Sequence, residues 1–269
     1  MSDSVRHILS LSGGKDSAAL AVYMRDRVPE MEYIFHDTDK ELPETYQYLA
    51  RLEAILGKRI HHTTSEKSFD HWLTVYGGMI PSSHRRWCTR MMKLRPFEAY
   101  VGDDPVINYV GLRADEDREG YISHKPNIKA VYPFREDGLV YADIARILEE
   151  SGLGLPKYTE WGRTRSGCFF CFFQQKIEWV RLMEKYPDLF EQAKEYERAN
   201  KKNGNPFYWC GAEPLEELEK PDRVAEIKRK WDESQQARRA SSGKLLHILG
   251  QPDYDDEDDQ DRPCLICQL

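Results

Sequence analysis

Short apolar runs alternate along the first half of the chain with segments whose apolar residues recur at helical spacing. The runs are rich in β-forming residues, and each of the first two precedes a segment with one apolar helical face. The predicted strands are residues 5–11, 33–35, a short segment at Ile60 and 106–110, and the predicted helices are residues 16–25, 43–56 and 69–76. Strands that alternate with helices predict βαβ units. We therefore expect an α/β fold with a doubly wound, mainly parallel sheet.

The pattern changes after about residue 133. Residues 141–150 have helical spacing, residues 151–165 form a glycine-containing loop, and further helices are predicted from about residues 174 and 187. We place a boundary near residue 130. The expected organisation is an α/β domain over residues 1–130, a helical subdomain packed on the sheet over residues 131–250, and an acidic tail over residues 251–269.

The net charge of −7 is concentrated at the C-terminal end. Seven of the 46 acidic residues lie between residues 253 and 261, and the remaining 39 equal the number of lysines and arginines. The body of the chain is therefore formally neutral. Two stretches within it contain no acidic residue at all, between residues 71 and 97 and between residues 161 and 177. The first holds five cationic residues, which suits phosphate oxygens or else forms the solvated face of an amphipathic helix.

No window is apolar over the roughly 18 residues that a membrane span needs, and the N-terminus lacks the pattern of an export signal. We therefore expect a cytoplasmic protein that does not contact a membrane. The chain has six cysteines. In a chain of this length without an export signal, they are expected to be metal ligands or reactive thiols rather than a disulfide framework.

A glycine-containing loop joins the first predicted strand to the first predicted helix. Residues 12–17 read Ser-Gly-Gly-Lys-Asp-Ser. Backbone N–H groups and the positive end of a helix bind anions at such a junction, and glycines let the backbone approach closely. The spacing differs from that of the common nucleotide loop, which has four residues between its first glycine and Gly-Lys-Ser/Thr. We interpret the segment as a phosphate-binding loop.

This loop resembles the SGGKDS signature of the PP-loop (N-type) ATP pyrophosphatases, which cut ATP between its α and β phosphates. Further segments resemble the phosphoadenosine phosphosulfate reductase-like superfamily, although Asp39 stands where that superfamily usually has glycine. The matching segments are His36–Tyr46, Cys88–Pro96, Gly111–Arg118 and Ser166–Cys171. The resemblance covers most of residues 7–185 and implies the adenine nucleotide alpha hydrolase-like α/β fold, with the first domain binding ATP.

The resemblance also implies roles for individual residues. Lys15 and the amides of Gly13 and Gly14 would stabilise the departing pyrophosphate together with Mg²⁺, which Asp16 would help to position. Asp37 would contact the ribose or the metal, and Arg113 and Arg118 would face the phosphate of the acceptor. The predicted catalytic residues are Lys15, Asp16, Arg113 and Cys267. The predicted nucleotide-binding residues are Ser10, Ser12, Gly13, Gly14, Lys15, Asp16, Ser17, Asp37, Thr38, Gly111 and Arg113.

Two cysteine pairs have the two-residue gap that lets both thiolates reach one metal ion: Cys168 with Cys171, and Cys264 with Cys267. One interpretation is a zinc knuckle, although the pairs are further apart than is usual. The resemblance implies instead a 4Fe-4S cluster held by Cys88, Cys168 and Cys171. The fourth ligand is then Cys210, Cys264 or Cys267, or an open iron site that accepts sulfide. The terminal pair has a second interpretation as a mobile dithiol that carries sulfur or electrons, and Cys210 as a buried inert thiol.

The leading functional prediction is an ATP-dependent enzyme that adenylylates an acceptor oxygen, releases pyrophosphate and lets a sulfur nucleophile displace AMP. Within the superfamily, the chain most resembles the sulfurtransferase of Dnd- or Ssp-type DNA phosphorothioation. That resemblance implies DNA as the acceptor, a cysteine desulfurase as the sulfur donor, and partner subunits that help to bind DNA, because the neutral body gives no strong electrostatic attraction.

Three alternatives remain open. A reductase of adenylyl or phosphoadenylyl sulfate shares the fold, but the chain ends in Cys-Leu-Ile-Cys-Gln-Leu rather than in the single-cysteine motif of those enzymes. A tRNA thiolase shares the loop chemistry, but no RNA-binding appendage is recognisable. A catalytically silent nucleotide-binding partner would keep the loop without turnover.

Overall fold

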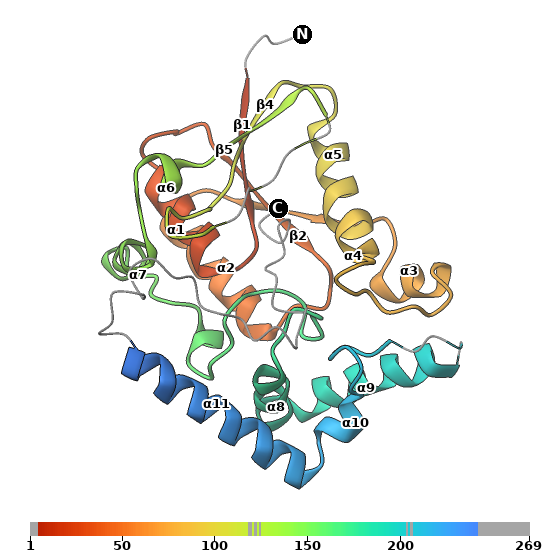
Figure 1. Cartoon of the computed structure of the whole chain (residues 1–269). Helices are drawn as coiled ribbons and strands as arrows, with labels where there is room; N and C mark the ends of the chain where they lie inside the picture. The colour runs from red at the N-terminus through yellow and green to blue at the C-terminus, as the bar shows by residue number, and fades with distance from the viewer. Residues whose placement is uncertain are drawn as a thin grey trace. The chain divides into compact units, whose positions relative to one another are not determined.

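The computed structural model describes residues 5–117, 120, 123, 125–202, 204 and 207–241 (Figure 1). The chain divides into two compact units. Within the described residues, the sheet unit comprises residues 5–72 and 86–168, and the helical unit comprises residues 73–85 and 169–241. The sheet unit therefore extends well beyond residue 130, because helix α7 (Tyr141–Glu150) packs on helix α1 (Lys15–Met24).

The sheet unit contains a five-stranded sheet in the order β3-β2-β1-β4-β5, and every neighbouring pair is parallel. The predicted α/β fold with a doubly wound parallel sheet is thus confirmed. The fifth strand was missed by the sequence pattern, because it is only four residues long and only its first residue is buried. The strands are β1 (Arg6–Leu11), β2 (Glu32–Asp37), β3 (Ile60–Thr64), β4 (Val106–Tyr109) and β5 (Ile128–Val131).

Helices cover both faces of this sheet, because alternate residues of the central strands are apolar on both sides. Leu9 and Leu11 of β1 face a core shared with α1, α7 and α2 (Pro43–Leu56), whereas Ile8 faces Phe97 of α5 (Arg95–Val101). Helix α2 begins at a proline and ends at Gly57, whose φ is +63°. The remaining elements of this unit are α4 (Trp87–Thr89), the π-helix η1 (Arg90–Leu94), α6 (Pro133–Glu136) and the 3₁₀ turn η2 (Lys157–Thr159), and α3 (Phe69–Val75) crosses into the helical unit.

The order of the strands reverses between β1 and β4. The chain leaves β1 toward β2 and β3 on one side, and then crosses to β4 and β5 on the other. In open parallel sheets, ligands bind outside the carboxyl ends of the strands at such a reversal. The loop of residues 12–14 follows β1 at this edge, and Gly111 follows β4. The fold therefore brings two predicted ligand-binding segments to the edge where ligands usually bind.

The helical unit has its own core, built from aromatic side chains. Trp209 stacks on Phe170 with ring centroids 5.0 Å apart, and Trp179 packs beside Trp209. Glu197 is buried and accepts hydrogen bonds from the backbone N–H groups of Trp209 and Leu215. The helices are α8 (Lys176–Lys185), α9 (Pro187–Lys202), α10 (Leu215–Leu218) and α11 (Pro221–Ser241).

Among the described residues, no helix combines the length and the apolar character that crossing a bilayer requires.

Candidate functional site

The loop between β1 and α1 depends on glycine at two positions. Gly13 has a φ of +71°, and a Cβ atom there would lie 2.4 Å from Cγ2 of the buried Thr45. A Cβ atom on Gly14 would lie 2.8 Å from Oγ of Ser166. The backbone of the loop can therefore lie against α2 and against the segment before Cys168 only because both side chains are absent.

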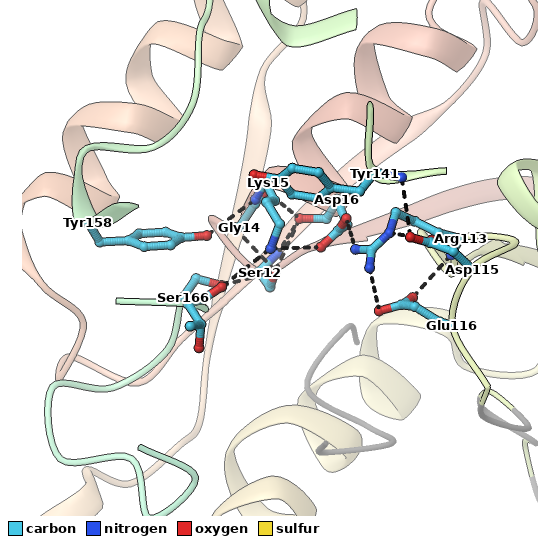
Figure 2. A network of polar contacts seen from close by, with 12 residues as sticks. Ser12, Gly14, Lys15, Asp16, Arg113, Asp115, Glu116, Tyr141, Tyr158 and Ser166 are labelled. Atoms are coloured by element: carbon cyan, nitrogen blue, oxygen red, sulfur yellow. Dashed lines mark hydrogen bonds and ion pairs between the residues drawn. The ribbon is translucent and has the colours of Figure 1, made fainter. Parts of the chain in front are cut away.

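A group of hydroxyls holds the loop in shape (Figure 2). The Oγ atoms of Ser12 and Ser17 lie 3.1 Å apart, and the Ser12 hydroxyl accepts a hydrogen bond from the backbone N–H of Gly14. Oγ of Ser166 donates to Oγ of Ser12 across 3.3 Å. Ser17 donates back to the carbonyl of Gly14. Two predicted nucleotide-binding serines thus order the loop from within, and Ser166 joins them from a distant part of the chain.

Lys15 begins α1, directly after the glycines. Its Nζ lies 3.5 Å from a carboxylate oxygen of Asp16 and donates to the carbonyl oxygen of Thr164 across 3.3 Å. Its backbone N–H points to the hydroxyl of Tyr158 at 3.4 Å. Burial raises the pKa of Tyr158, so this hydroxyl stays neutral at physiological pH. The N-cap residue of the helix, Gly14, supplies no side-chain cap, and the positive end of the helix favours an anion at this position.

Arg113 reaches the same helix end from the segment after β4 (Figure 2). Its Nη1 lies 2.7 Å from Asp16 and its Nε 2.8 Å from Asp115, and Glu116 lies 3.6 Å from Nη2. Burial lowers the pKa of Arg113, but the charges of Asp16 and Glu116 more than offset this, so the guanidinium is permanently charged. A Cβ atom on Gly111 would lie 3.0 Å from the carbonyl oxygen of Asp16, so glycine is what lets this segment approach α1.

The site carries more negative than positive charge. Lys15 and Arg113 face the carboxylates of Asp16, Asp115 and Glu116. A polyphosphate would be repelled unless a divalent cation accompanied it. Among the described residues, no three His, Cys, Asp or Glu side chains are grouped so that they could hold a metal ion by themselves. Mg²⁺ is usually held by one or two carboxylates and by substrate phosphates, so the carboxylate of Asp16 could ligate it together with a bound nucleotide.

The segment after β2 places its predicted residues differently. Oδ1 of Asp37 accepts hydrogen bonds from the backbone N–H of Asp39 and from the Tyr46 hydroxyl, so one of its oxygens is already used. Thr38 is buried and donates to Glu41, with Sγ of Cys168 3.1 Å from its hydroxyl. Thr38 thus lies beside a predicted metal ligand.

Ser10 lies inside β1 rather than in the loop, and it is only 1% exposed. Its hydroxyl has no hydrogen-bond partner in the described part of the chain. The prediction that Ser10 contacts the nucleotide therefore stays a prediction.

The predicted cluster ligands are distributed over both units. Cys88 in α4 and Cys168 are half-buried in the sheet unit, whereas the half-buried Cys171 and the buried Cys210 belong to the helical unit. The Cys168 thiol also lies 3.8 Å from Oε1 of Glu41, a buried carboxyl whose pKa is raised by desolvation. The roles of these cysteines as cluster ligands therefore stay predictions.

Arg118, Cys264 and Cys267 lie outside the described residues, as does the acidic run between residues 253 and 261. The roles predicted for these residues stay predictions.

The cationic residues of the first acid-free stretch, between residues 71 and 97, differ in their exposure to solvent. Arg90 and Arg95 are exposed on η1 and at the start of α5. Lys93 is half-buried, and its charge acts on buried groups: together with the larger effect of burial, it lowers the pKa of His36 to about 3. Only part of the stretch is therefore a surface feature.

The structure adds site residues that sequence reasoning missed. Tyr158, Tyr141 and the carbonyl of Thr164 all reach Lys15, although they are at least 126 positions away from it along the chain. None of the three residues belongs to a segment that the sequence analysis identified as a motif, so no local signal could have identified them. Only the tertiary fold places these three residues beside the loop.

Several known proteins have sequences similar to this chain. Two uncharacterised proteins of Methanocaldococcus jannaschii are 26% and 25% identical to this chain over 69% and 68% of its length. The chain spans only 40% and 45% of the length of those relatives. An uncharacterised 37.8 kDa protein of Escherichia phage 186 is 22% identical over 84% of this chain and 85% of its own length.

Two solved structures are similar in part. A phosphoadenylyl-sulfate reductase from Candida auris superposes with a TM-score of 0.49 and 15% identity, over 61% of this chain and 82% of its own. The tRNA thiolase NcsA from Methanococcus maripaludis, solved with its 4Fe-4S cluster, superposes with a TM-score of 0.42 and 13% identity, over 74% of this chain and 72% of its own.

The phosphoadenosine phosphosulfate reductase domain family matches residues 6–129. This range runs from β1 into β5, and it includes the glycine loop, Lys15, Asp16 and Arg113. Residues 6–129 are therefore similar to the phosphoadenosine phosphosulfate reductase domain family.

Proposed function

We propose that this chain is an ATP pyrophosphatase that adenylylates a DNA backbone phosphate and so enables sulfur to be inserted there. The observation that supports the proposal most strongly is the pairing of two cations at one helix end. Lys15 follows the glycine loop, and Arg113 approaches Asp16 from the end of β4, at the edge where the strand order reverses. Such a site can hold two phosphate groups close together, one from ATP and one from an acceptor.

Binding of ATP would rearrange the contacts of Lys15. Its ammonium group contacts Asp16 and the carbonyl of Thr164. The β and γ phosphates would replace these partners, because a charge-assisted bond to phosphate is stronger than one to a carbonyl. Asp16 would then be able to ligate the Mg²⁺ that accompanies ATP. The loop amides would contribute further N–H donors.

The proposed chemistry has two displacement steps. In the first, a non-bridging oxygen of the acceptor phosphate attacks the α phosphorus of ATP, and the bond to the β-phosphate oxygen breaks. Pyrophosphate leaves with its charge stabilised by Lys15 and the loop amides. In the second, hydrosulfide attacks the acceptor phosphorus, its proton passes to solvent, and AMP leaves with the oxygen. Sulfur thereby replaces one acceptor oxygen, with no change in the oxidation state of phosphorus.

A cysteine desulfurase is the proposed source of the sulfur. It converts cysteine sulfur to a persulfide, and a dithiol reductant releases hydrosulfide from that persulfide. Exposed cations at Arg90 and Arg95 in the sheet unit are consistent with contact to a nucleic-acid backbone. Partner subunits are proposed to supply most of the remaining affinity for DNA, because the chain outside the acidic run between residues 253 and 261 is formally neutral.

The test combines the purified chain with ATP, Mg²⁺, cysteine, a cysteine desulfurase, dithiothreitol, the partner subunits and DNA, without oxygen. Digestion of the DNA and mass spectrometry should then detect phosphorothioate dinucleotides. We expect the product to form about a hundredfold more slowly with Lys15→Ala and at the wild-type rate with Lys129→Ala, which removes an exposed lysine of β5. DNA without phosphorothioate in the complete wild-type reaction would refute the DNA assignment.

A second candidate is reduction of adenylyl or phosphoadenylyl sulfate, which the matching family name favours over residues 6–129. This activity would release sulfite with thioredoxin as the reductant and would not consume ATP. Sulfite release without ATP would therefore support the reductase and oppose the sulfurtransferase.

A further inference from the structure

An exposed tyrosine lies beside the two cations of the candidate site. Tyr141 begins α7 and is 45% exposed. Its ring centroid is 5.9 Å from Nζ of Lys15 and 5.7 Å from Cζ of Arg113 (Figure 2). A large aromatic ring is thus presented to solvent next to the groups proposed to bind phosphate.

The backbone of Tyr141 is held by the same carboxylate that orients Arg113. Oδ1 of Asp115 accepts from Nε of Arg113, and Oδ2 accepts from the backbone N–H of Tyr141. Helix α7 also packs on α1, with Ile144 and Leu148 in the shared core. The start of α7 is therefore held close to α1, and the ring of Tyr141 lies near both cations.

An aromatic ring beside cations is a recurring arrangement in proteins that bind single-stranded nucleic acid. The ring stacks on a base, and the cations contact the adjoining phosphate. Each stacked base contributes about 1–3 kcal/mol, and stacking tolerates every base because each has a π face. The ring of Tyr141 and the neighbouring cations thus suit a nucleotide whose base is exposed and whose phosphate contacts Arg113.

The geometry of the sheet separates this ring from the ribose side of ATP. Asp37 and Thr38 follow β2, whereas Arg113 follows β4, and these strands flank β1 on opposite sides. With the adenosine toward β2, as the predicted roles of Asp37 and Thr38 require, the ring of Tyr141 is left for the second substrate.

We propose that Tyr141 is the stacking platform for an unpaired base of the acceptor DNA, next to the phosphate that is adenylylated. This rests on the proposed function. Arg113 contacts that phosphate, and the base lies on the tyrosine ring. The acceptor is therefore bound as a single strand or with one base turned out of the duplex.

The test measures the affinity of the full chain, with its partner subunits, for a short fluorescent single-stranded DNA at fixed salt concentration and with a non-hydrolysable ATP analogue. The variants are Tyr141→Ala and Tyr141→Phe, and the matched control is Phe207→Ala, which removes a ring that is 44% exposed in the helical unit. Tyr141→Ala is expected to weaken DNA binding about 5- to 150-fold. Tyr141→Phe and Phe207→Ala are expected to bind within about twofold of wild type, because stacking needs the ring and not the hydroxyl.

The affinity for the ATP analogue alone distinguishes the two substrates, and it should be unchanged in Tyr141→Ala. A fall in that affinity would assign the ring to ATP and overturn the proposal. Wild-type DNA binding by Tyr141→Ala, equal weakening by Tyr141→Phe, or tighter binding of RNA of the same sequence would also overturn it. If the wild-type chain with its partners binds no DNA, the proposed function itself fails. If the wild-type chain binds DNA and Tyr141→Ala binds it equally well, only the role of Tyr141 fails.

Discussion

Asp39 departs from a family pattern in its side chain but adopts the backbone conformation that is typical of glycine. It follows β2 where the resembling superfamily usually has glycine, and its φ is +56°. Among the described residues, it is the only one other than glycine with a positive φ. Aspartate is one of the few side chains that tolerate this conformation. The sequence alone indicated the departure from the pattern, but not that the left-handed turn was retained.

Replacing Asp39 with glycine should therefore stabilise the protein. We expect Asp39→Gly to raise the free energy of unfolding by up to about 1 kcal/mol, and Asp39→Val to lower it by about 1–3 kcal/mol, because a β-branched residue is strained at positive φ. The control is Asp103→Gly, an exposed turn aspartate without a positive φ, which should cost about 0.5–1 kcal/mol. Urea denaturation measures all three. Equal losses from Asp39→Gly and Asp103→Gly would contradict the account.

Some residues of the candidate site could be predicted from the sequence, and others could not. Lys15, Asp16 and Arg113 could be predicted because they stand in short motifs whose spacing has a physical meaning. Tyr141 and Tyr158 could not, because they reach Lys15 only through tertiary packing. Ser166 begins a matching segment, but that match did not indicate that its hydroxyl contacts the loop. Motifs reveal groups that are close in sequence, whereas tertiary packing supplies the others.

At the scale of elements, the strand–loop–helix unit from β1 to α1 was predictable, because an apolar run, two glycines and a helical face follow in order. The segment from α4 to α5 was harder to predict. Its sequence shows a row of basic residues, and its helical run includes the π-helix η1 with Lys93 half-buried. An exposed basic residue and a half-buried lysine look the same in the sequence. The charge pattern alone therefore could not distinguish Lys93 from the exposed cations around it.

Gly13 offers a test of how tightly the loop is packed. Gly13→Ala adds a methyl group at positive φ and 2.4 Å from Cγ2 of Thr45, whereas Gly57→Ala adds one at a similar φ with no atom within 4 Å. We expect Gly57→Ala to cost about 1 kcal/mol and Gly13→Ala about 2–4 kcal/mol in the free energy of unfolding. Thr45→Ser removes Cγ2 and should recover part of the loss when combined with Gly13→Ala. Equal costs for the two alanine variants would show that the loop is not crowded.

Glu197 makes the stability of the helical unit depend on pH. Burial raises the pKa of its carboxyl from 4.5 to about 7, although the N–H groups of Leu215 and Trp209 partly offset this. The folded protein then binds more protons than the unfolded chain between these pH values. The free energy of unfolding should therefore fall as pH rises from about 4.5 to about 7, by at most about 3 kcal/mol from this group.

The measurement is chemical denaturation of wild type and Glu197→Gln at pH 5 and pH 8. Between these two values, the stability of wild type should fall further than that of Glu197→Gln. Glu195→Gln is the matched control, because it removes an exposed carboxyl from the same helix, α9. Parallel behaviour of wild type and Glu197→Gln would rule out the raised pKa.

At the scale of the whole molecule, the sheet unit carries the groups proposed to bind and activate phosphate, and the helical unit has a separate aromatic core. The overall class was predictable because alternating strands and helices permit few arrangements. The metal-binding prediction was not settled in the same way. Its candidate cysteines are divided between the two units, and two of them lie outside the described residues.

The central claim is that ATP is cut between its α and β phosphates at the Lys15 loop. The most direct measurement is the identity of the products when the chain is incubated with ATP, Mg²⁺, DNA, its partner subunits and a hydrosulfide source. We predict equal amounts of AMP and pyrophosphate, about a hundredfold slower with Lys15→Ala and unchanged with Lys129→Ala. ADP and phosphate from the wild-type chain, no cleavage at all, or AMP formed equally fast by Lys15→Ala would contradict the account.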